Sequence, residues 1–542
     1  MELLEQHFDT AFSAPDGIKQ LRELILTLAM QGKLVPQNPS DSPASELLKD
    51  IEAEKKRLVK EGKIKTSKPL PPVTEEEKPY ELPKGWEWIR FPACYSGIGS
   101  KNNQIQAKEY QEAGECPVVD QGKKLIPGFT NQKEKKLYLD KPVIVFGDHT
   151  RNIKFIDFDF VIGADGVKVL RPYDVVSTEF LFRAMQSYDL TDRGYARHFR
   201  VLNEQLVPLP PLPEQHRIVA KIDQLMSRCD ALEKLRAAQE AKRLAVHAAA
   251  LSQLLDTAGD GSTDDAWTFI TQHFGDLYAV KENVAELRKA ILQLAVMGKL
   301  VLQDPSDPPA SELLKEIEDE KKRETKEGKI KAAKPLHEIS ANETPYPLPK
   351  GWIWVRIVDL VDVGTGSTPD TTNQEYYNGS IPWYTSSATN NLFAEDPEKF
   401  ITEKAIKETN CKVFPSGSLI VAMYGQGKTR GQISEIVTPG ATNQAVAAMV
   451  FYVSSQGVKS YLKYFFVKIY DEIRLLAEGA AQPNLNVGKI KKTLVPLPPL
   501  LEQKRIVAKI DKLMELCDLL DEYINTSTSK QTELLNAVMA KV

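Results

Sequence analysis

The stretch LVPLPPLPEQHRIVAKIDQLM at Leu206–Met226 occurs a second time, almost unchanged, as LVPLPPLLEQKRIVAKIDKLM at Leu494–Met514. Extended to Leu206–Glu233 and Leu494–Asp521, the two copies share 21 of 28 positions. After the prolines, which cannot continue a helix interior, apolar side chains recur every three or four residues. Each copy therefore predicts the start of a long helix with a heptad-like apolar seam. The seam residues are Ile218, Ile222, Leu225, Cys229 and Leu232 in the first copy, and Ile506, Ile510, Leu513, Cys517 and Leu520 in the second.

A second piece is also duplicated, and each copy of it precedes unmatched sequence. Gly32–Trp88 and Gly298–Trp354 align without a gap and share 39 of 57 positions. Between the duplicated pieces lie Phe91–Gln205 and Ile357–Thr493, which show no comparable match. The order is cyclic: the middle of the chain carries both pieces in succession, and the two ends supply the same pair if they lie side by side. We expect a pseudo-twofold protein in which two similar frames hold different inserts.

The duplicated pieces are predicted to be helical, and the inserts to be mixed α/β. A helix over Glu214–Leu255, a polar loop at Asp256–Asp265 and a second helix carrying Leu287 favour an antiparallel helix pair. Short apolar runs bounded by Gly, Asp, Asn and Pro, such as PVIVF at Pro142–Phe146, are typical of strands. The predicted fold class is therefore α+β, with two mixed α/β domains separated by long antiparallel helix pairs that form a coiled-coil-like spacer.

Composition excludes several classes of protein. The net charge of the 542 residues is −4, so a nucleic-acid ligand would need a local positive field. No signal peptide and no run of ~18 apolar residues is visible, and the seven histidines lack metal-site spacing. The cysteines form no C-x-x-C pair, so we expect buried free thiols in a reducing compartment. They are Cys94, Cys116, Cys229, Cys411 and Cys517.

Two stretches imitate enzyme motifs. AMYGQGKT at Ala422–Thr429 resembles a phosphate-binding loop, but Ala422 replaces the first glycine and the glycine-rich RGQISEIVTPG follows instead of a helix. DPPA at Asp307–Ala310 is similar to the D-P-P-aromatic loop of amino-methyltransferases, yet Ala310 replaces the aromatic residue. In this context Asp307 is expected to cap a helix with Pro308 at its first position. The chain is therefore expected to be non-catalytic.

Several segments together resemble one known family. The duplicated LVPLPPLPEQ segment, GTGSTPDTTNQEYYNGSIPWYTSS and AEGAAQPNLNVGKIKK in the second insert, and VIVFGDHTRNIKFIDFDFVIGADGVK in the first are similar to type I restriction–modification specificity (S, or HsdS) subunits. The long piece before the first insert is similar to the branch with an extended N-terminal segment. The first insert departs from the pattern, because it ends RGYARHFRVLNEQ where the second has GAAQPNLNVGKI. The resemblance covers essentially the whole chain.

The resemblance implies a division of labour. Each insert would be a target recognition domain that reads one half of a bipartite, asymmetric sequence in double-stranded DNA. The helical spacer would set the gap and dock two modification (M) methyltransferase subunits, and restriction (R) subunits would join them. This chain would bind no cofactor; S-adenosylmethionine, ATP and Mg²⁺ would belong to the partner subunits. The complex would be cytoplasmic in a prokaryote and would not involve a membrane.

The implied division of the chain has five segments. They are an N-terminal conserved helical segment with its Pro-rich connector (1–90), recognition domain 1 (91–205), a central conserved helical spacer and connector (206–356), recognition domain 2 (357–493), and a C-terminal conserved helix that pairs with the N-terminal segment (494–542). Two alternatives remain open: a helical scaffold that does not read DNA, and a nucleotide-binding enzyme that uses the P-loop-like stretch.

The candidate DNA-binding residues are polar and basic side chains on loops. Arg can pair bidentately with guanine and Gln or Asn with adenine, whereas Lys mostly positions the DNA backbone. In the second domain the candidates are Gln426, Lys428, Thr429 and Arg430, with Gln482, Asn484 and Asn486 just before the duplicated piece. In the first domain they are His149, Thr150, Arg151 and Lys154, with Arg197, His198 and Arg200. No residue is predicted to be catalytic or to bind a metal.

Overall fold

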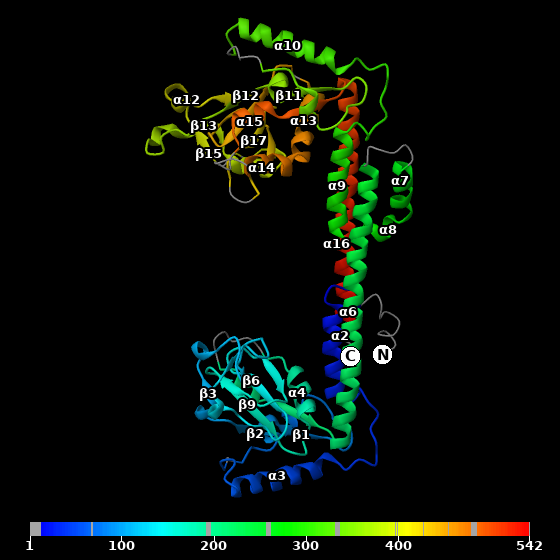
Figure 1. Cartoon of the computed structure of the whole chain (residues 1–542), viewed down its shortest axis with the longest axis vertical. Helices are drawn as coiled ribbons and strands as arrows, with labels where there is room; N and C mark the ends of the chain where they lie inside the picture. The colour runs from blue at the N-terminus through cyan, green and yellow to red at the C-terminus, as the bar shows by residue number, and fades with distance from the viewer. Residues whose placement is uncertain are drawn as a thin grey trace. The chain divides into compact units, whose positions relative to one another are not determined.

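The computed structural model describes residues 12–66, 69–190, 197–255, 262–330, 336–395, 397, 399–425, 428–453, 455–478 and 485–540. The chain divides into two compact units (Figure 1): unit 1 is Met1–Gln239 with Ser527–Val542, and unit 2 is Glu240–Thr526. Both boundaries fall inside long helices, α6 (Leu212–Leu255) and α16 (Leu500–Met539), which begin where the duplicated prolines end. Each unit therefore combines parts of several predicted segments, and the five-segment division stays a prediction.

In unit 1, helix α2 (Gly17–Met30) runs antiparallel to the first half of α6. Near the middle of α2, the Arg22 guanidinium lies 2.7 Å from the Asp230 carboxylate. Beyond the end of α2, Gly32 packs against Trp86, whose indole N–H donates to Glu214 at the beginning of α6 (3.0 Å). Because the residue numbers rise along α2 while they fall along α6, the two helices point in opposite directions. The predicted antiparallel pairing of conserved helices is thus confirmed inside this unit.

The C-terminal end of α16 completes the helical layer of unit 1. Leu535 and Val538 are buried against Phe12 and Leu24 in one apolar cluster. The end of the C-terminal helix thus contacts the N-terminal segment by ordinary apolar packing, in the way that the cyclic order of the repeats requires.

Unit 2 repeats this arrangement with one difference from the prediction. Helix α9 (Lys281–Val296) is antiparallel to α16, and Arg288 reaches Asp518 (2.7 Å) and Asp521 (2.9 Å). The end of α6, however, runs beside α9 in the same direction (Figure 1), because α7 (Ser262–Gln272) and α8 (Phe274–Leu277) carry the chain back between them. The expected antiparallel hairpin of α6 with α9 is wrong, and part of the expected polar loop is helix.

The apolar seams and the cysteines lie where the repeat predicts. Ile218 and Ile222 of α6, and Ile506 and Ile510 of α16, are at most 1% exposed. All five cysteines are free and buried, as expected. Within the described residues no helix is long and apolar enough to cross a bilayer.

Each charged helix of the duplicated piece is preceded by an aspartate, and Asp307, the one before the second helix, has a different role from the one predicted. Helix α3 spans Ala44–Lys60 and helix α10 spans Ala310–Lys326, and the residue capping α10 is Pro309. Asp307 is therefore not the N-cap. Its carboxylate is bound instead by Arg505 of α16 (2.5 Å), as Asp41 is bound by Arg217 of α6 (2.7 Å).

Two-stranded ribbons join each insert to its long helix. Strand β1 (Glu87–Arg90) pairs with β10 (Leu206–Leu209), and β11 (Ile353–Arg356) pairs with β21 (Leu494–Leu497), in the same antiparallel register. These ribbons bring the start and end of each insert together at the beginning of α6 or α16.

Each insert contains two small sheets. Four strands of the first sheet follow the same order in both inserts although the sequences do not match, and the sheet of unit 2 has β14 as an additional edge strand. In unit 1 the orders are β2-β9-β6-β7 and β3-β8-β4-β5; in unit 2 they are β12-β20-β17-β18-β14 and β15-β13-β19-β16. The strands of unit 1 are β2 (Tyr95–Ile98), β3 (Gln104–Ile105), β4 (Cys116–Val119), β5 (Gly128–Thr130), β6 (Val143–Gly147), β7 (Ile153–Ile156), β8 (Val161–Gly163) and β9 (Val167–Pro172). Those of unit 2 are β12 (Val361–Thr365), β13 (Tyr377–Tyr384), β14 (Phe393–Ala394), β15 (Lys399–Ile401), β16 (Val413–Phe414), β17 (Leu419–Ala422), β18 (Ile433–Ile436), β19 (Gly440–Thr442) and β20 (Val446–Phe451).

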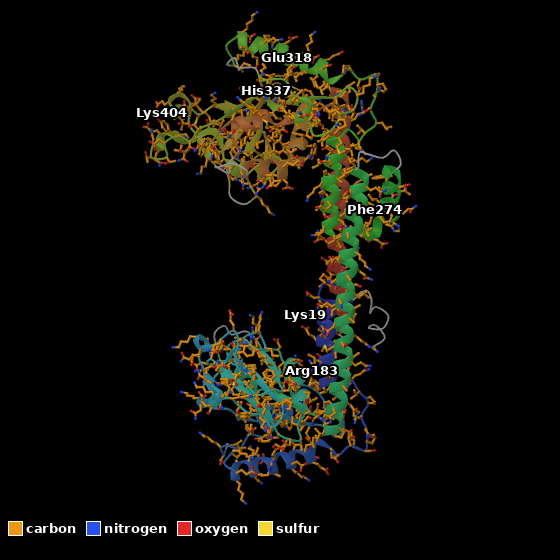
Figure 2. All side chains as sticks on the ribbon, viewed as in Figure 1. Lys19, Arg183, Phe274, Glu318, His337 and Lys404 are labelled. Carbon is orange, nitrogen blue, oxygen red and sulfur yellow. The ribbon has the colours of Figure 1, made fainter. Side chains whose placement is uncertain are left out.

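Short helices complete the inserts and fix them to the long helices. In unit 1, Arg183 of α4 donates to Asp223 of α6 (2.7 Å), at the junction marked in Figure 2. In unit 2 the corresponding helix α13 holds Tyr464, whose hydroxyl donates to Asp511 of α16. The short helices are α4 (Thr178–Gln186), α5 (Phe199–Asn203), α11 (Ile357–Leu360), α12 (Glu403–Glu408), α13 (Gln456–Lys468), α14 (Tyr470–Glu478) and α15 (Val487–Lys492).

Candidate nucleic-acid interface

The predicted basic loops of the two inserts lie on equivalent hairpins. The loop between β6 and β7 carries His149, Thr150 and Arg151, and the loop between β17 and β18 carries Lys428 and the residues beside it. In both units the strand before the loop is paired on its other side with the long strand β9 or β20. Two stretches chosen for their chemistry alone therefore occupy the same topological position.

In unit 1, the first hairpin loop meets the start of helix α5. The Asp148 carbonyl accepts a hydrogen bond from the backbone N–H of His198 (2.8 Å), and the Asp148 carboxylate accepts one from Phe199 N–H (2.9 Å). Asp148 is 4% exposed, so these bonds are well shielded from water. The two clusters predicted in the first insert are thus brought together by Asp148, a residue that sequence reasoning missed.

The exposed members of this combined cluster are Thr150, Arg197 and Arg200, while Arg151 is half-buried. Arg200 also forms an ion pair with Glu204 (3.2 Å). Arg151 adopts a positive φ of 61° in the tight hairpin loop, and its guanidinium donates to the Leu190 carbonyl (2.8 Å). Because the Thr150 hydroxyl donates to the Gln121 carbonyl, the donors that this cluster presents are the exposed guanidinium groups of Arg197 and Arg200, which suit phosphates and base edges.

Two predicted DNA-binding residues of the first insert are not on the surface. Lys154 is 6% exposed; its ammonium group lies 3.4 Å from the Asp120 carboxylate and donates to the Lys124 carbonyl (2.5 Å). Burial lowers the pKa of Lys154, and the Asp120 carboxylate offsets part of that change. His198 is completely buried, with Nδ1 3.1 Å from the Asp148 carbonyl oxygen. The expectation that these two side chains face a ligand directly is wrong, because both serve the packing of the loops.

In unit 2, the hairpin loop is held by helix α14. The Tyr470 hydroxyl donates to the Lys428 carbonyl, and the Arg474 guanidinium donates to the Arg430 carbonyl (3.0 Å). The Lys428 side chain is exposed, and Thr429 and Arg430 are half-buried. Because the chain enters strand β18 soon after this loop, the positive end of a helix dipole is not available for phosphates. The structure thus disfavours the P-loop interpretation.

The second predicted cluster of this unit is only partly described. Gln482 and Asn484 of this cluster lie outside the described residues, as does Gln426 of the hairpin loop. Asn486 is exposed and caps α15, since its side-chain oxygen accepts a hydrogen bond from Lys489 N–H (2.8 Å). Helix α15 precedes β21 as α5 precedes β10, so Asn486 and the Arg197–Arg200 cluster stand at equivalent places in the chain.

A cavity that sequence reasoning missed follows strand β13 in unit 2. It has a volume of about 430 Å³ and lies under the loop that leads into β14. Hydroxyl and amide side chains of Thr385, Ser387, Asn390 and Asn391 line it beside the half-exposed ring of Phe393. The signal in the sequence was the run TSSATNN, which has the turn-forming composition of a loop but no recognisable motif.

The described residues contain no group of three or more His, Cys, Asp or Glu side chains that could hold a metal ion. The arrangement that does recur is a polar hairpin loop beside the start of a short helix, once in each unit. Such a surface can donate hydrogen bonds and positive charge to a polyanion.

Comparison with known proteins gives one consistent result. The family model described as the type I restriction modification DNA specificity domain matches residues 96–243 and 349–527. The specificity subunit of the type I restriction enzyme EcoAI of Escherichia coli is 34% identical over 96% of this chain and 93% of its own length. That of EcoEI, also from Escherichia coli, is 33% identical over the same shares. The HsdS subunit from Thermoanaerobacter tengcongensis, a solved structure, is 18% identical, with 84% of this chain and 97% of that chain covered at a TM-score of 0.41.

Proposed function

The chain belongs to the family of type I restriction–modification DNA specificity subunits, which recognise the DNA target, and from this premise we propose how the recognition is divided. Each unit reads one half of a bipartite, asymmetric target in double-stranded DNA. The observation that carries this proposal is the pair of equivalent hairpins, which share a strand order and differ in their loops. Two hairpins with the same strand order but with loops of different sequence suit a target whose halves have different sequences.

The exposed side chains of the loops supply two kinds of contact. Lys428, Arg197 and Arg200 contact phosphates and so set the position of the DNA without reading its sequence. The half-buried Arg430 and Arg151 are the better candidates for base edges, because a guanidinium fixed by its surroundings can make the two parallel bonds that guanine offers.

The long helices set the distance between the two half-sites. Helix α6 is an unbroken helix of 44 residues, or roughly 66 Å at about 1.5 Å per residue. Half-sites one turn of DNA apart are separated by about 34–36 Å, so one such helix is long enough. Deletion of two heptads between Glu214 and Leu255 is expected to change the gap in the target or to abolish assembly. An unchanged gap with full activity would refute this role.

The partner subunits carry the chemistry. Two M subunits bind S-adenosylmethionine and methylate adenine, while R subunits use ATP and Mg²⁺ for translocation and cleavage, in the cytoplasm. A surface for such a partner is available on α16, where Leu516, Leu519 and Tyr523 are 47%, 54% and 72% exposed at helical spacing. Apolar side chains in such a row favour a protein partner over bulk water.

The test is to co-express the chain with its M subunits and to map methylated adenines across a genome. We expect a two-part asymmetric motif with a fixed gap. The variant K428A/R430A should weaken selection of one half only, and K315A/K326A, which removes two exposed lysines of α10, serves as the matched control. Methylation without sequence preference, or none despite a stable complex, would leave the scaffold alternative.

A further inference from the structure

A third loop lies against the hairpin loop of unit 1. It follows strand β4 and has the sequence DQGKKL (Asp120–Leu125). Lys123, Lys124 and Leu125 are exposed, and Leu125 is 48% exposed. The duplicated segments do not include this loop, and none of its residues was a candidate for DNA binding from the sequence.

Gln121 joins this loop to two others. Its side-chain oxygen accepts a hydrogen bond from His149 N–H (3.2 Å), and its amide nitrogen donates to the carbonyl of Asp165 (3.0 Å). Its backbone carbonyl accepts from the Thr150 hydroxyl and from the Asn152 amide (2.8 Å). A single residue therefore fixes the β6–β7 hairpin loop against both the β4–β5 loop and the β8–β9 turn.

Lys154 holds the other end of the same loop. From strand β7, its buried ammonium group binds the Asp120 carboxylate and the Lys124 carbonyl, at the two sides of the lysine-bearing turn. Because this bond uses the backbone of Lys124, it leaves the Lys124 side chain exposed. The loop supplies the carboxylate and the carbonyl that compensate the buried ammonium charge of Lys154, and these same bonds hold the loop in place.

Two glycines allow these loops to approach so closely. A Cβ atom on Gly147 would lie 2.8 Å from Cβ of Gln121 and closer still to the Thr150 hydroxyl. Gly166 has a φ of +85°, and a Cβ there would lie 2.8 Å from the His149 ring. Neither position accommodates a side chain without displacing a member of the cluster.

We infer that the Asp120–Leu125 loop is a third DNA-contacting segment of unit 1, in which Lys123 and Lys124 bind phosphates. Gln121 and Lys154 are positioning residues that fix this loop to the hairpin. The inference rests on the proposed function and adds a set of residues to it. Unit 2 contrasts with this arrangement. Its strand β13 matches β4 in having one parallel and one antiparallel neighbour, and the loop after β13 reads TSSATNN and contains no lysine.

The first experiment measures binding of the assembled complex with M subunits to a duplex carrying the mapped target, over a range of salt concentrations. K123A/K124A should weaken binding on the order of 10-fold at moderate salt and reduce the salt slope by roughly 1.8, because each lost phosphate contact removes about 0.9. The mapped motif should not change. The control K49A/K60A, which removes two exposed lysines of α3, should leave the slope unaltered.

The second experiment tests positioning with Gln121→Met, which keeps the side-chain length and removes the side-chain bonds to His149 and Asp165, while the bonds to the backbone carbonyl of residue 121 remain. Discrimination between the correct and an altered first half-site should fall about 10-fold, while discrimination at the second half-site is retained. If wild-type complex reads the bipartite target but K123A/K124A behaves like its control, the inference is overturned and the proposed function stands. If wild-type complex reads no bipartite target, the proposed function itself fails.

Discussion

The hairpin loops of the two units are the same element fastened in two different ways. In unit 1 the loop is tied to a neighbouring loop of the sheets by Gln121 and to the start of helix α5 by Asp148. In unit 2 the equivalent loop is tied to helix α14 by Tyr470 and Arg474. The connection between each ribbon and its long helix is, by contrast, the same in both units. Trp86 donates to Glu214 and Trp352 donates to Glu502, each at 3.0 Å.

This contrast separates the ribbons and long helices, which are alike in the two units, from the hairpin loops, which differ. The ribbon and the long helix place each insert, and a duplicated sequence can supply duplicated placement. A hairpin loop that reads bases has to match its own half-site, so its sequence and its fastening are specific to one unit. A change in one loop should therefore affect one half of the target, whereas a change in the frame should affect the stability of the unit that contains it.

The largest expected effect comes from exchanging the whole first insert. Replacement of Phe91–Gln205 by the insert of another family member should change the first half of the target and leave the second half and the gap as they were. Each wrong base pair costs about 1–3 kcal/mol, so a half-site of a few base pairs should lose at least ~100-fold in preference. Mapping of methylated adenines measures this result. A change in both halves would show that the units do not read independently.

The next prediction concerns the frame, that is, the ribbon and long helix of each unit. Removal of the indole hydrogen bond that Trp86 and Trp352 make should lower the stability of both units, but by unequal amounts. Glu214 accepts bonds from Trp86 and from Gln37 (3.1 Å), whereas one carboxylate oxygen of Glu502 has no hydrogen-bond partner among the described residues. Loss of a hydrogen bond to a charged group costs about 1.5–3 kcal/mol.

We therefore expect Trp352→Phe to destabilise unit 2 by more than Trp86→Phe destabilises unit 1. Amide hydrogen exchange at β11 and β21, compared with β1 and β10, resolves the two units. Equal losses of protection would mean that Gln37 does not compensate Glu214.

A smaller effect is expected where the fastening differs. Arg474→Met keeps the apolar contacts of the side chain but removes its bonds to the Arg430 carbonyl and to the Tyr470 hydroxyl. Discrimination at the second half-site should fall about 10-fold, which corresponds to 1.4 kcal/mol, the size of one such bond. Competition binding with duplexes altered in one half at a time measures it. Because Gln121→Met should act on the other half only, loss of both halves in either variant would contradict separate fastening.

The sequence predicted the frame well because the frame is periodic. The spacing of Ile218, Ile222 and Cys229 indicates a buried seam, and the matching order of the repeats required the chain ends to meet, as Leu535 and Phe12 do. The predicted direction of α9 relative to α6 was wrong because helices α7 and α8 reverse the chain between them. A short apolar pattern such as that of Ala266 and its neighbours does not indicate such a reversal.

The interface was predicted less completely, for a different reason. Basic loop residues were assigned to DNA by their chemistry, and chemistry does not tell an exposed lysine from one that holds a loop. Lys154 alternates with apolar residues along β7 and binds Asp120 in the loop after β4, a long-range contact that no local pattern encodes. Gln121 was missed because its role lies in long-range hydrogen bonds, two to backbone groups and two from the side chains of Thr150 and Asn152.

The smallest expected effect is a pH dependence of the stability of unit 2. Burial raises the pKa of Glu502, with a further contribution from Asp307 nearby, while Trp352 and Arg505 act against the rise. A carboxyl group whose folded-state pKa is raised stabilises the fold below its unfolded pKa of about 4.3, and this contribution is lost as the pH rises through the folded pKa. In Glu502→Gln the side chain can still accept the indole bond but no longer titrates.

Wild-type unit 2 should therefore lose protection against amide exchange, after correction for the intrinsic rate, as the pH rises from about 4.3 through the folded pKa of Glu502, and Glu502→Gln should flatten this slope. The matched variant is Glu214→Gln, which changes the same position of unit 1, where Gln37 already binds the second carboxylate oxygen. A slope at β1 and β10 that Glu214→Gln removes equally would show that the two frames are electrostatically equivalent. The unpartnered oxygen of Glu502 would then have no energetic consequence.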